Sequence, residues 1–266
     1  MPLLKNLLFP PMCAGCDTLI PVADWRRGEE CFCPDCRAAW ELAKLALCPR
    51  CGEARMDCRC MPPVLSRSGM ETLVALTAYG ADAADGVTPV ADRLILCLKD
   101  KHIGAYETFL ASQLVYGVRD AMDARGWSRE ETVISYCPRG PRKVRASGTD
   151  QAGRIAEKLA HLLELPCVPL FRHVGDGEQK RLGEQARAEH AHRAYRLRQN
   201  VRVAAKRVIL VDDIVTTGAS MAACCELLLE AGALSVIGVA VARTQEKQQK
   251  MPSDRKKYQK QLEIVP

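Results

Sequence analysis

Residues 208–220, VILVDDIVTTGAS, constrain the fold of this chain more than any other segment. The apolar run 208–211 predicts a parallel strand buried on both faces, and ligands of such sheets bind beyond the carboxyl ends of the strands. Asp212 and Asp213 are therefore expected at the rim of the sheet. A hydroxyl-rich turn follows, and it precedes a helical pattern at 221–231 whose free amides suit a phosphate dianion. The segment thus predicts a ribose phosphate site, with the acids on the ribose hydroxyls or on a magnesium ion bound to them.

The cysteines gather near the N-terminus, where nine of the fourteen lie within the first sixty residues. In a reducing compartment, Cys-x-x-Cys pairs are more often metal ligands than disulfides, and four thiolates close around one tetrahedral zinc. Cys31 is left as a spare thiol. The second set ends in a pair with one intervening residue, so the sequence leaves open whether one structural zinc or two are bound. The predicted ligands are Cys13, Cys16, Cys33 and Cys36 in the first set, and Cys48, Cys51, Cys58 and Cys60 in the second.

A chain of 266 residues with 48% hydrophobic residues is long enough to bury an α/β core and carry a smaller module besides. The first ten residues are too short and too interrupted by lysine and proline for a signal peptide or a membrane span, which predicts a cytoplasmic protein without membrane insertion. We expect a double zinc ribbon at 1–62, an α/β domain at 63–244 and a basic tail at 245–266.

The remaining chain alternates between strand and helix patterns, which predicts a mostly parallel sheet flanked by helices. The expected strands are 72–79, 132–137, 167–171, 208–211 and 234–241. The expected helices are 90–99, 106–123, 149–163 and 221–231.

The pair of acids with its Thr-Thr-Gly turn resembles the motif by which type I phosphoribosyltransferases bind 5-phosphoribosyl 1-diphosphate (PRPP). Residues 138–152, PRGPRKVRASGTDQA, are similar to an element of the ComF family. Gln179 with Leu182, Arg187, and Ala194 with Tyr195 match further positions of that family. The ComF family commonly begins with a cysteine-rich double zinc ribbon, so the resemblance covers nearly the whole chain and implies a type I phosphoribosyltransferase fold.

The resemblance also implies roles for individual residues. Asp212 and Asp213 would hold ribose and stabilise the positive charge that develops at carbon 1, while Arg187 would belong to a lid that excludes water. Mg²⁺ would accompany PRPP. The 5-phosphate would be bound by Thr216, Thr217, Gly218, Ala219 and Ser220, and the diphosphate by the loop that contains Pro138, Arg139 and Arg142.

Three positions depart from the family pattern. Ser147 stands in place of an arginine, Thr149 in place of a phenylalanine and His190 in place of an asparagine. Loss of an arginine beside a diphosphate removes a charge-assisted donor that serine does not replace, which favours weak transfer. The alternative function is therefore a weak or inactive transferase that serves as a zinc-ribbon adaptor for single-stranded DNA or for DNA-uptake proteins, and the formal net charge of +6 permits it.

Overall fold

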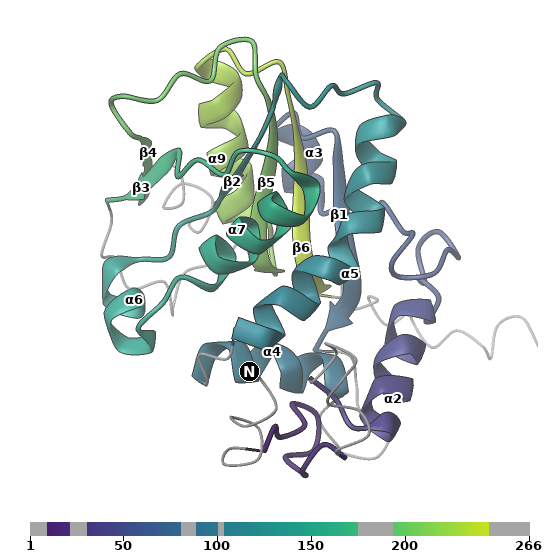
Figure 1. Cartoon of the computed structure of the whole chain (residues 1–266). Coiled ribbons are helices and arrows are strands. Elements are labelled where there is room, and N and C mark those ends of the chain that lie inside the picture. Colours follow the sequence, from purple (N-terminus) through teal and green to yellow (C-terminus); the bar gives the residue numbers. More distant parts are fainter. Residues whose placement is uncertain (1–9, 22–30, 81–88, 101–103, 175–193, 245–266) are drawn as a thin grey trace, which may run out of the picture.

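The computed structural model describes residues 10–21, 31–80, 89–100, 104–174 and 194–244 (Figure 1). Arg187, the 179–190 positions of the family resemblance and the basic tail lie outside these residues, so the expectations for them stay predictions. The elements, in chain order, are α2 Pro34–Leu45, α3 Pro63–Arg67, β1 Thr72–Tyr79, α4 Val90–Asp100, α5 Gly104–Asp123, β2 Thr132–Tyr136, α6 Pro141–Ser147, α7 Gln151–Leu163, β3 Phe171–His173, β4 Tyr195–Leu197, β5 Arg207–Val215, α9 Ala219–Glu230 and β6 Ser235–Thr244.

The core of the molecule is a four-stranded sheet in the order β1-β6-β5-β2, and all three strand pairs are parallel. β5 therefore lies between β6 and β2, with Ile209 level with Ile237 on one side and with Ile134 on the other. Parallel strands buried on both faces carry continuous apolar runs, and residues 208–211 are fully buried. The expected parallel α/β fold is confirmed.

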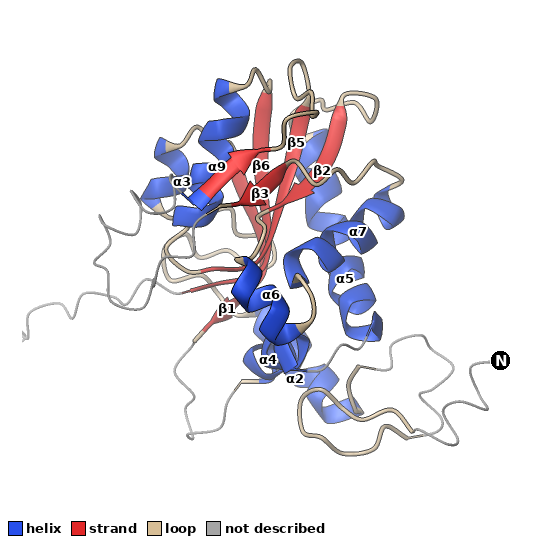
Figure 2. Cartoon of the chain, turned by 90° about the vertical axis from the view of Figure 1, so that its left-hand side faces the viewer, coloured by secondary structure: helices blue, strands red, loops and turns tan. Residues whose placement is uncertain are grey.

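Helices cover both faces of this sheet (Figure 2). Alternate side chains of β5 point to opposite faces, because Ile209 and Val211 pack in one apolar cluster and Val208 and Leu210 in another. The first cluster contains residues of α4, α5 and α7, and the second contains residues of α3 and α9. The result is three layers, with the carboxyl ends of all four strands at one edge.

The cysteine-rich segment packs on the first of these clusters. Phe32 and Trp40 lie against Phe109 of α5, with ring centroids 5.5 and 5.7 Å from that of Phe109. Trp40 is fully buried. An aromatic side chain of this kind removes roughly 150–250 Å² from water, which at about 25 cal/mol/Å² is on the order of 4–6 kcal/mol. The segment is thus fixed to the α/β core by apolar contacts as well as by any metal.

The structure corrects the sequence-based elements in three places. β5 does not end before the acids but continues through them to Val215. Of the expected strand 167–171, only Cys167 bridges to β2, and the ladder stops there because the Leu170 amide donates to the Ser135 hydroxyl, 3.2 Å away, and not to a backbone carbonyl. Phe171 instead begins β3, which is antiparallel to β4.

The third correction is α6, which lies where the sequence suggested only a loop. Pro141 occupies the first turn, where a missing amide proton costs nothing, and Gly148 ends the helix with φ +75°.

Within the described ranges, no helix is both long and apolar enough to cross a membrane.

Candidate functional site

The two acids of β5 lie at the carboxyl edge of the sheet, and both are half-buried. Each carboxylate accepts a hydrogen bond from the next amide in the chain: Asp213 N donates to Asp212 Oδ1 and Ile214 N donates to Asp213 Oδ1, both at 2.8 Å. Burial raises the pKa of Asp212, and the neighbouring carboxylates of Asp213 and Asp150 raise it further. The acids therefore repel one another electrostatically, and a bound cation or ribose hydroxyls would relieve that repulsion.

Asp150, which the sequence did not single out, is the third acid of this group. It caps α7 by accepting from Gly153 N at 3.4 Å, and it accepts from Arg139 N at 2.9 Å. Burial raises the pKa of Asp150, with a contribution from Asp213, although the two amide donors oppose the shift. The Pro138–Gly140 turn is thereby fixed to the start of α7.

The Arg139 side chain points toward the end of α6. Its guanidinium donates to Gln151 Oε1 and, at 3.5 Å, to Ser147 Oγ. Gln151 is itself buried and donates to Leu98 O at 3.2 Å. The guanidinium of Arg139 thus lies beside the serine that stands in place of the family arginine, whereas Arg142 is exposed on the first turn of α6.

The phosphate turn, residues 216–220, joins β5 to α9. Gly218 has φ +82° and is the residue before the helix, so no side chain of its own caps the first amides. A Cβ at Gly218 would lie 3.0 Å from Leu65 Cγ and 3.2 Å from Val64 Cγ1 of α3. The Ala219 amide makes only a long contact of 3.4 Å with Thr217 Oγ1. The amino end of α9 therefore offers amide protons and its positive dipole end to an anion.

The β3–β4 ribbon lies against both parts of this edge. The rings of His173 and Tyr195 meet edge to face, with centroids 5.2 Å apart. Burial raises the pKa of Tyr195, and a hydrogen bond with Ser220 of the phosphate turn opposes the shift. On the other side, His173 Cε1 would be 3.4 Å from a Cβ at Gly140. The ribbon thus lies next to both the phosphate turn and the 138–140 turn.

An open cavity of about 440 Å³ lies between α6, the 138–141 turn and the ribbon. Four arginines contribute to its wall, and an adjoining cavity of about 400 Å³ shares two of them, Arg172 and Arg198. Their charges suit an anionic ligand. The residues that line the larger cavity are Tyr136, Pro138, Arg139, Pro141, Val144, Arg145, Asp150, Phe171, Arg172, His173 and Arg198.

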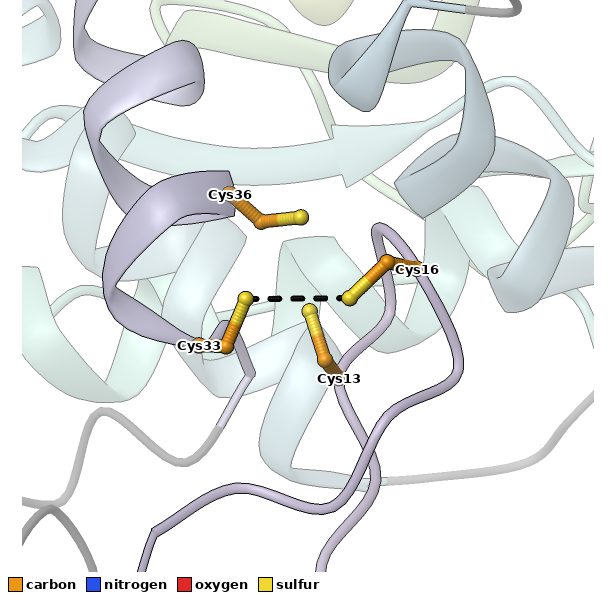
Figure 3. Close-up of side chains that lie close together, drawn as sticks. All are labelled: Cys13, Cys16, Cys33 and Cys36. Atoms are coloured by element: carbon orange, nitrogen blue, oxygen red, sulfur yellow. Dashed lines mark hydrogen bonds between the residues drawn. The ribbon is translucent and has the colours of Figure 1, made fainter.

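Both predicted cysteine sets come together in space. In each set the four sulfurs lie within 4.8 Å of one another. Figure 3 shows the first set, in which Cys33 and Cys36 come from the start of α2 and face Cys13 and Cys16. The sulfurs of Cys16 and Cys33 are 3.7 Å apart, and those of Cys51 and Cys58 are 3.2 Å apart.

The Cys16–Cys33 distance fits a bound metal ion, and the Cys51–Cys58 sulfurs lie closer together than zinc would hold them. Zinc–sulfur bonds of about 2.3 Å in a tetrahedron place the sulfurs about 3.8 Å from one another. The donors are all thiols, the set that favours zinc over magnesium or calcium. Cys31 is buried and donates to Ala105 O at 3.5 Å, so it belongs to neither set. Two cysteine clusters able to hold a metal are thus present, as the sequence predicted.

Residues 149–265 match the phosphoribosyl transferase domain family. Together with the parallel sheet and the acid-plus-turn motif at its carboxyl edge, this match defines the class: the chain carries a phosphoribosyltransferase-type domain.

Over 247 residues the chain is 27% identical to the DNA utilization protein YhgH of Salmonella typhimurium (strain LT2), covering 90% of this chain and 99% of that protein. It is 25% identical, with the same coverage, to the DNA utilization protein YhgH of Escherichia coli (strain K12). The phosphoribosyl transferase match, the similarity to the YhgH proteins and the two cysteine clusters agree with the resemblance to the ComF family that the sequence suggested.

Two solved structures are also similar. A purine phosphoribosyltransferase from Pyrococcus horikoshii Ot3 aligns with a TM-score of 0.31 and 15% identity, covering 51% of this chain and 83% of that one. The protein TT1426 from Thermus thermophilus aligns with a TM-score of 0.30 and 20% identity, covering 57% of this chain and 86% of that one.

Proposed function

We propose that the chain binds PRPP at the carboxyl edge of β5. The observation that carries this proposal is the arrangement of half-buried acids on β5 directly before a turn that presents the amino end of α9. A ribose 5-phosphate needs an anion site and hydroxyl acceptors a few residues apart, and this segment offers both. The 5-phosphate would lie on the amides and hydroxyls of 216–220, and the ribose hydroxyls on Asp212 and Asp213.

A divalent cation fits the acidic side of this site. Asp212 and Asp213 would hold Mg²⁺ through the ribose oxygens, and the ion would offset the charge of the diphosphate as it leaves. The grouping of three carboxylates supports this assignment: burial raises the pKa of Asp212 first, Asp213 and Asp150 raise it further, and a bound cation would lower their mutual repulsion.

The diphosphate would lie toward the arginine-lined cavity. Pro138 and Arg139 line this cavity, and Arg145 and Arg198 are also in its wall. The Arg139 guanidinium would have to leave Gln151 and Ser147 to contact a phosphate, so its present hydrogen bonds oppose tight diphosphate binding. Transfer to a base nitrogen, with cleavage of the C1–oxygen bond and release of diphosphate, is expected to be slow for this reason.

Each cysteine cluster is proposed to bind one structural zinc ion. Four-thiolate sites are closed to substrate, so these ions would hold the N-terminal segment in shape and take no part in transfer. Total zinc per chain, measured by atomic emission after gel filtration, is expected to be two.

Calorimetric titration of the zinc-loaded chain with PRPP and Mg²⁺ tests the ligand proposal. The Asp212→Asn, Asp213→Asn double variant should lose binding, because the amides cannot replace the negative charge. Asp123→Asn is the matched control, since Asp123 is an exposed acid at the far end of α5, and it should bind like the wild type. Absence of binding in the wild type would rule the proposal out.

A second candidate function, binding of single-stranded DNA, is favoured by the two adjoining basic cavities. Arg172 and Arg198 belong to both, and the rings of Tyr136 and His173 line the larger one, a combination of guanidinium groups and rings that suits phosphates with neighbouring bases. The relatives named for DNA utilization make such a role in DNA uptake the natural one to test.

Fluorescence anisotropy with a labelled oligothymidylate, repeated over a range of salt, tests DNA binding. The affinity should fall with salt, and the Arg172→Gln, Arg198→Gln variant should lower both the affinity and the salt dependence. Excess PRPP with Mg²⁺ distinguishes the functions: displacement of the oligonucleotide would mean a shared surface. Affinity that is the same in variant and wild type would exclude these cavities as the DNA site.

A further inference from the structure

A buried arginine connects the second cysteine cluster to the central sheet. Arg243 lies near the end of β6 and only 7% of its surface is exposed. Its backbone is level with Ala78 of β1 and with Val215 of β5, the residue directly before the phosphate turn. A long cation at such a position needs a partner, because burial of an unpaired charge costs several kcal/mol or more.

The partners of Arg243 are sulfur atoms. Its Nη2 donates to Cys58 Sγ at 2.8 Å and to Cys48 Sγ at 3.5 Å. Among the residues that the structure describes, no carboxylate pairs with Arg243. A guanidinium has no acceptor atom, so both sulfurs act as acceptors, as thiolates bound to a metal do.

The charge of a loaded site explains why an arginine suits this position. Four thiolates and one divalent ion leave about two negative charges, and Cys58 itself is fully buried. A guanidinium within hydrogen-bonding distance offsets part of that charge and limits how the Cys48 and Cys58 side chains turn.

The first cluster is held differently. There, Gly15 N donates to Cys13 Sγ at 3.3 Å, and Cys16 Sγ lies 2.9 Å from Thr18 Oγ1. The nearby Arg93 donates to the Gly15 carbonyl at 2.6 Å and not to a sulfur. Within the described residues, a cation donates to thiolates of the second cluster and not to those of the first, which makes the first a control within the same molecule.

We propose that Arg243 is a positioning residue of the second metal site: it orients Cys48 and Cys58 to hold the ion, and it joins that site to β6, the neighbour of the strand that carries the phosphate turn. The proposal rests on the metal binding proposed above for the second cluster. It requires that loss of Arg243 weaken metal binding at this cluster alone.

Zinc release from the full-length, zinc-loaded chain tests this requirement. A chromogenic chelator in excess should report the release of two zinc ions per chain. The Arg243→Met variant should release one of these ions about 10- to 100-fold faster than the wild type does. Arg243→Lys should be intermediate, because an ammonium keeps the charge but lacks the length and the planar geometry that place the Arg243 Nη2 between the two sulfurs. Arg125→Met is the matched control, since Arg125 pairs with Glu71 at 2.9 Å and contacts no cysteine.

Substitution of one cysteine ligand identifies which cluster releases its zinc faster. Cys51→Ser should leave one tightly held zinc, that of the first cluster, and Arg243→Met in this background should not change its release. With cobalt in place of zinc, the sulfur-to-metal charge-transfer band should shift in Arg243→Met and return toward the wild-type position in Arg243→Lys. Neither readout depends on PRPP binding or on transfer.

The outcomes separate the proposals. Fewer than two zinc ions in the wild type would overturn the second metal site itself. Two ions whose release is unchanged in Arg243→Met, or is accelerated equally at both sites, would overturn the role of Arg243 while leaving the site in place. If Arg243→Met does not fold, Arg243→Lys decides in the same way, by faster release of one equivalent or of neither.

Discussion

Replacement of Gly218 by alanine tests whether α3 supports the phosphate turn. Gly218 has φ +82°, a conformation that costs an L-residue about 1–2 kcal/mol, of which about 0.4–1 kcal/mol is recovered from the less flexible unfolded chain. The new methyl group would also lie 3.0 Å from Leu65, whose side chain is fully buried and has little room to move. Overpacking of this kind adds about 1–3 kcal/mol.

The total expected loss in the free energy of unfolding is therefore about 3 kcal/mol for Gly218→Ala. Gly126→Ala is a matched control, because Gly126 has φ +61° but no atom within 4 Å of the added Cβ. It should lose about 1 kcal/mol, the backbone part alone.

Urea unfolding of the zinc-loaded variants, followed by circular dichroism, measures both losses. Leu65→Ala should cost less free energy of unfolding in the Gly218→Ala background than in the wild type, because it removes the side chain that the new methyl group would clash with. Residues in contact couple by about 0.5–3 kcal/mol. Equal losses for Gly218→Ala and Gly126→Ala, or no coupling to Leu65, would refute the argument that α3 fixes the turn.

Three further predictions concern the acids and the metal. Because the pKa of Asp212 is raised on folding, stability is lost as the pH rises from the ordinary carboxylate value through the raised one. Without ligand, Asp212→Asn should therefore be more stable than the wild type near neutral pH and equal to it in acid, as urea titrations at several pH values would show. Chelation of the metal ions should abolish the near-ultraviolet dichroism of Trp40, which is packed beside the first cluster, and a Trp40→Phe variant should lack this signal with or without metal. Asp150→Ala should cost about 1 kcal/mol of stability through the lost α7 cap and should weaken PRPP binding in calorimetry, whereas Asp150→Asn should keep the stability and lose affinity.

Local sequence patterns were enough to predict the sheet and the cysteine sets. A buried parallel strand needs an apolar run of four or more residues, and a tetrahedral thiolate site needs paired cysteines at short spacing, so both can be recognised without tertiary information. The run 208–211 and the strand at 72–79 show this directly.

Features that depend on contacts between distant segments could not be predicted in this way. Asp150 became part of the acidic group only because α7 begins beside the end of β5, although an Asp before Gln-Ala and a helical pattern is a recognisable N-cap. Tyr195 reaches Ser220 through the β3–β4 ribbon, and Arg243 reaches Cys58 across 185 positions of sequence. The Ser135 hydroxyl that ends the 167–171 ladder gives no local sign of its role.

The contacts of the N-terminal segment explain why a phosphoribosyltransferase-type domain would retain it. The carboxyl edge of the sheet gathers three acids that repel one another and a helix end that lacks a side-chain cap, so the groups of the site themselves add little to stability. The supporting contacts come from residues before the sheet: Leu65 packs under Gly218, and the Cys48 and Cys58 sulfurs bind the arginine level with Val215. Of these contacts, that of Arg243 with Cys48 and Cys58 crosses the boundary expected at residue 62. It joins the N-terminal segment to the strand beside the proposed phosphoribose site, whether that site transfers its ligand or only binds it.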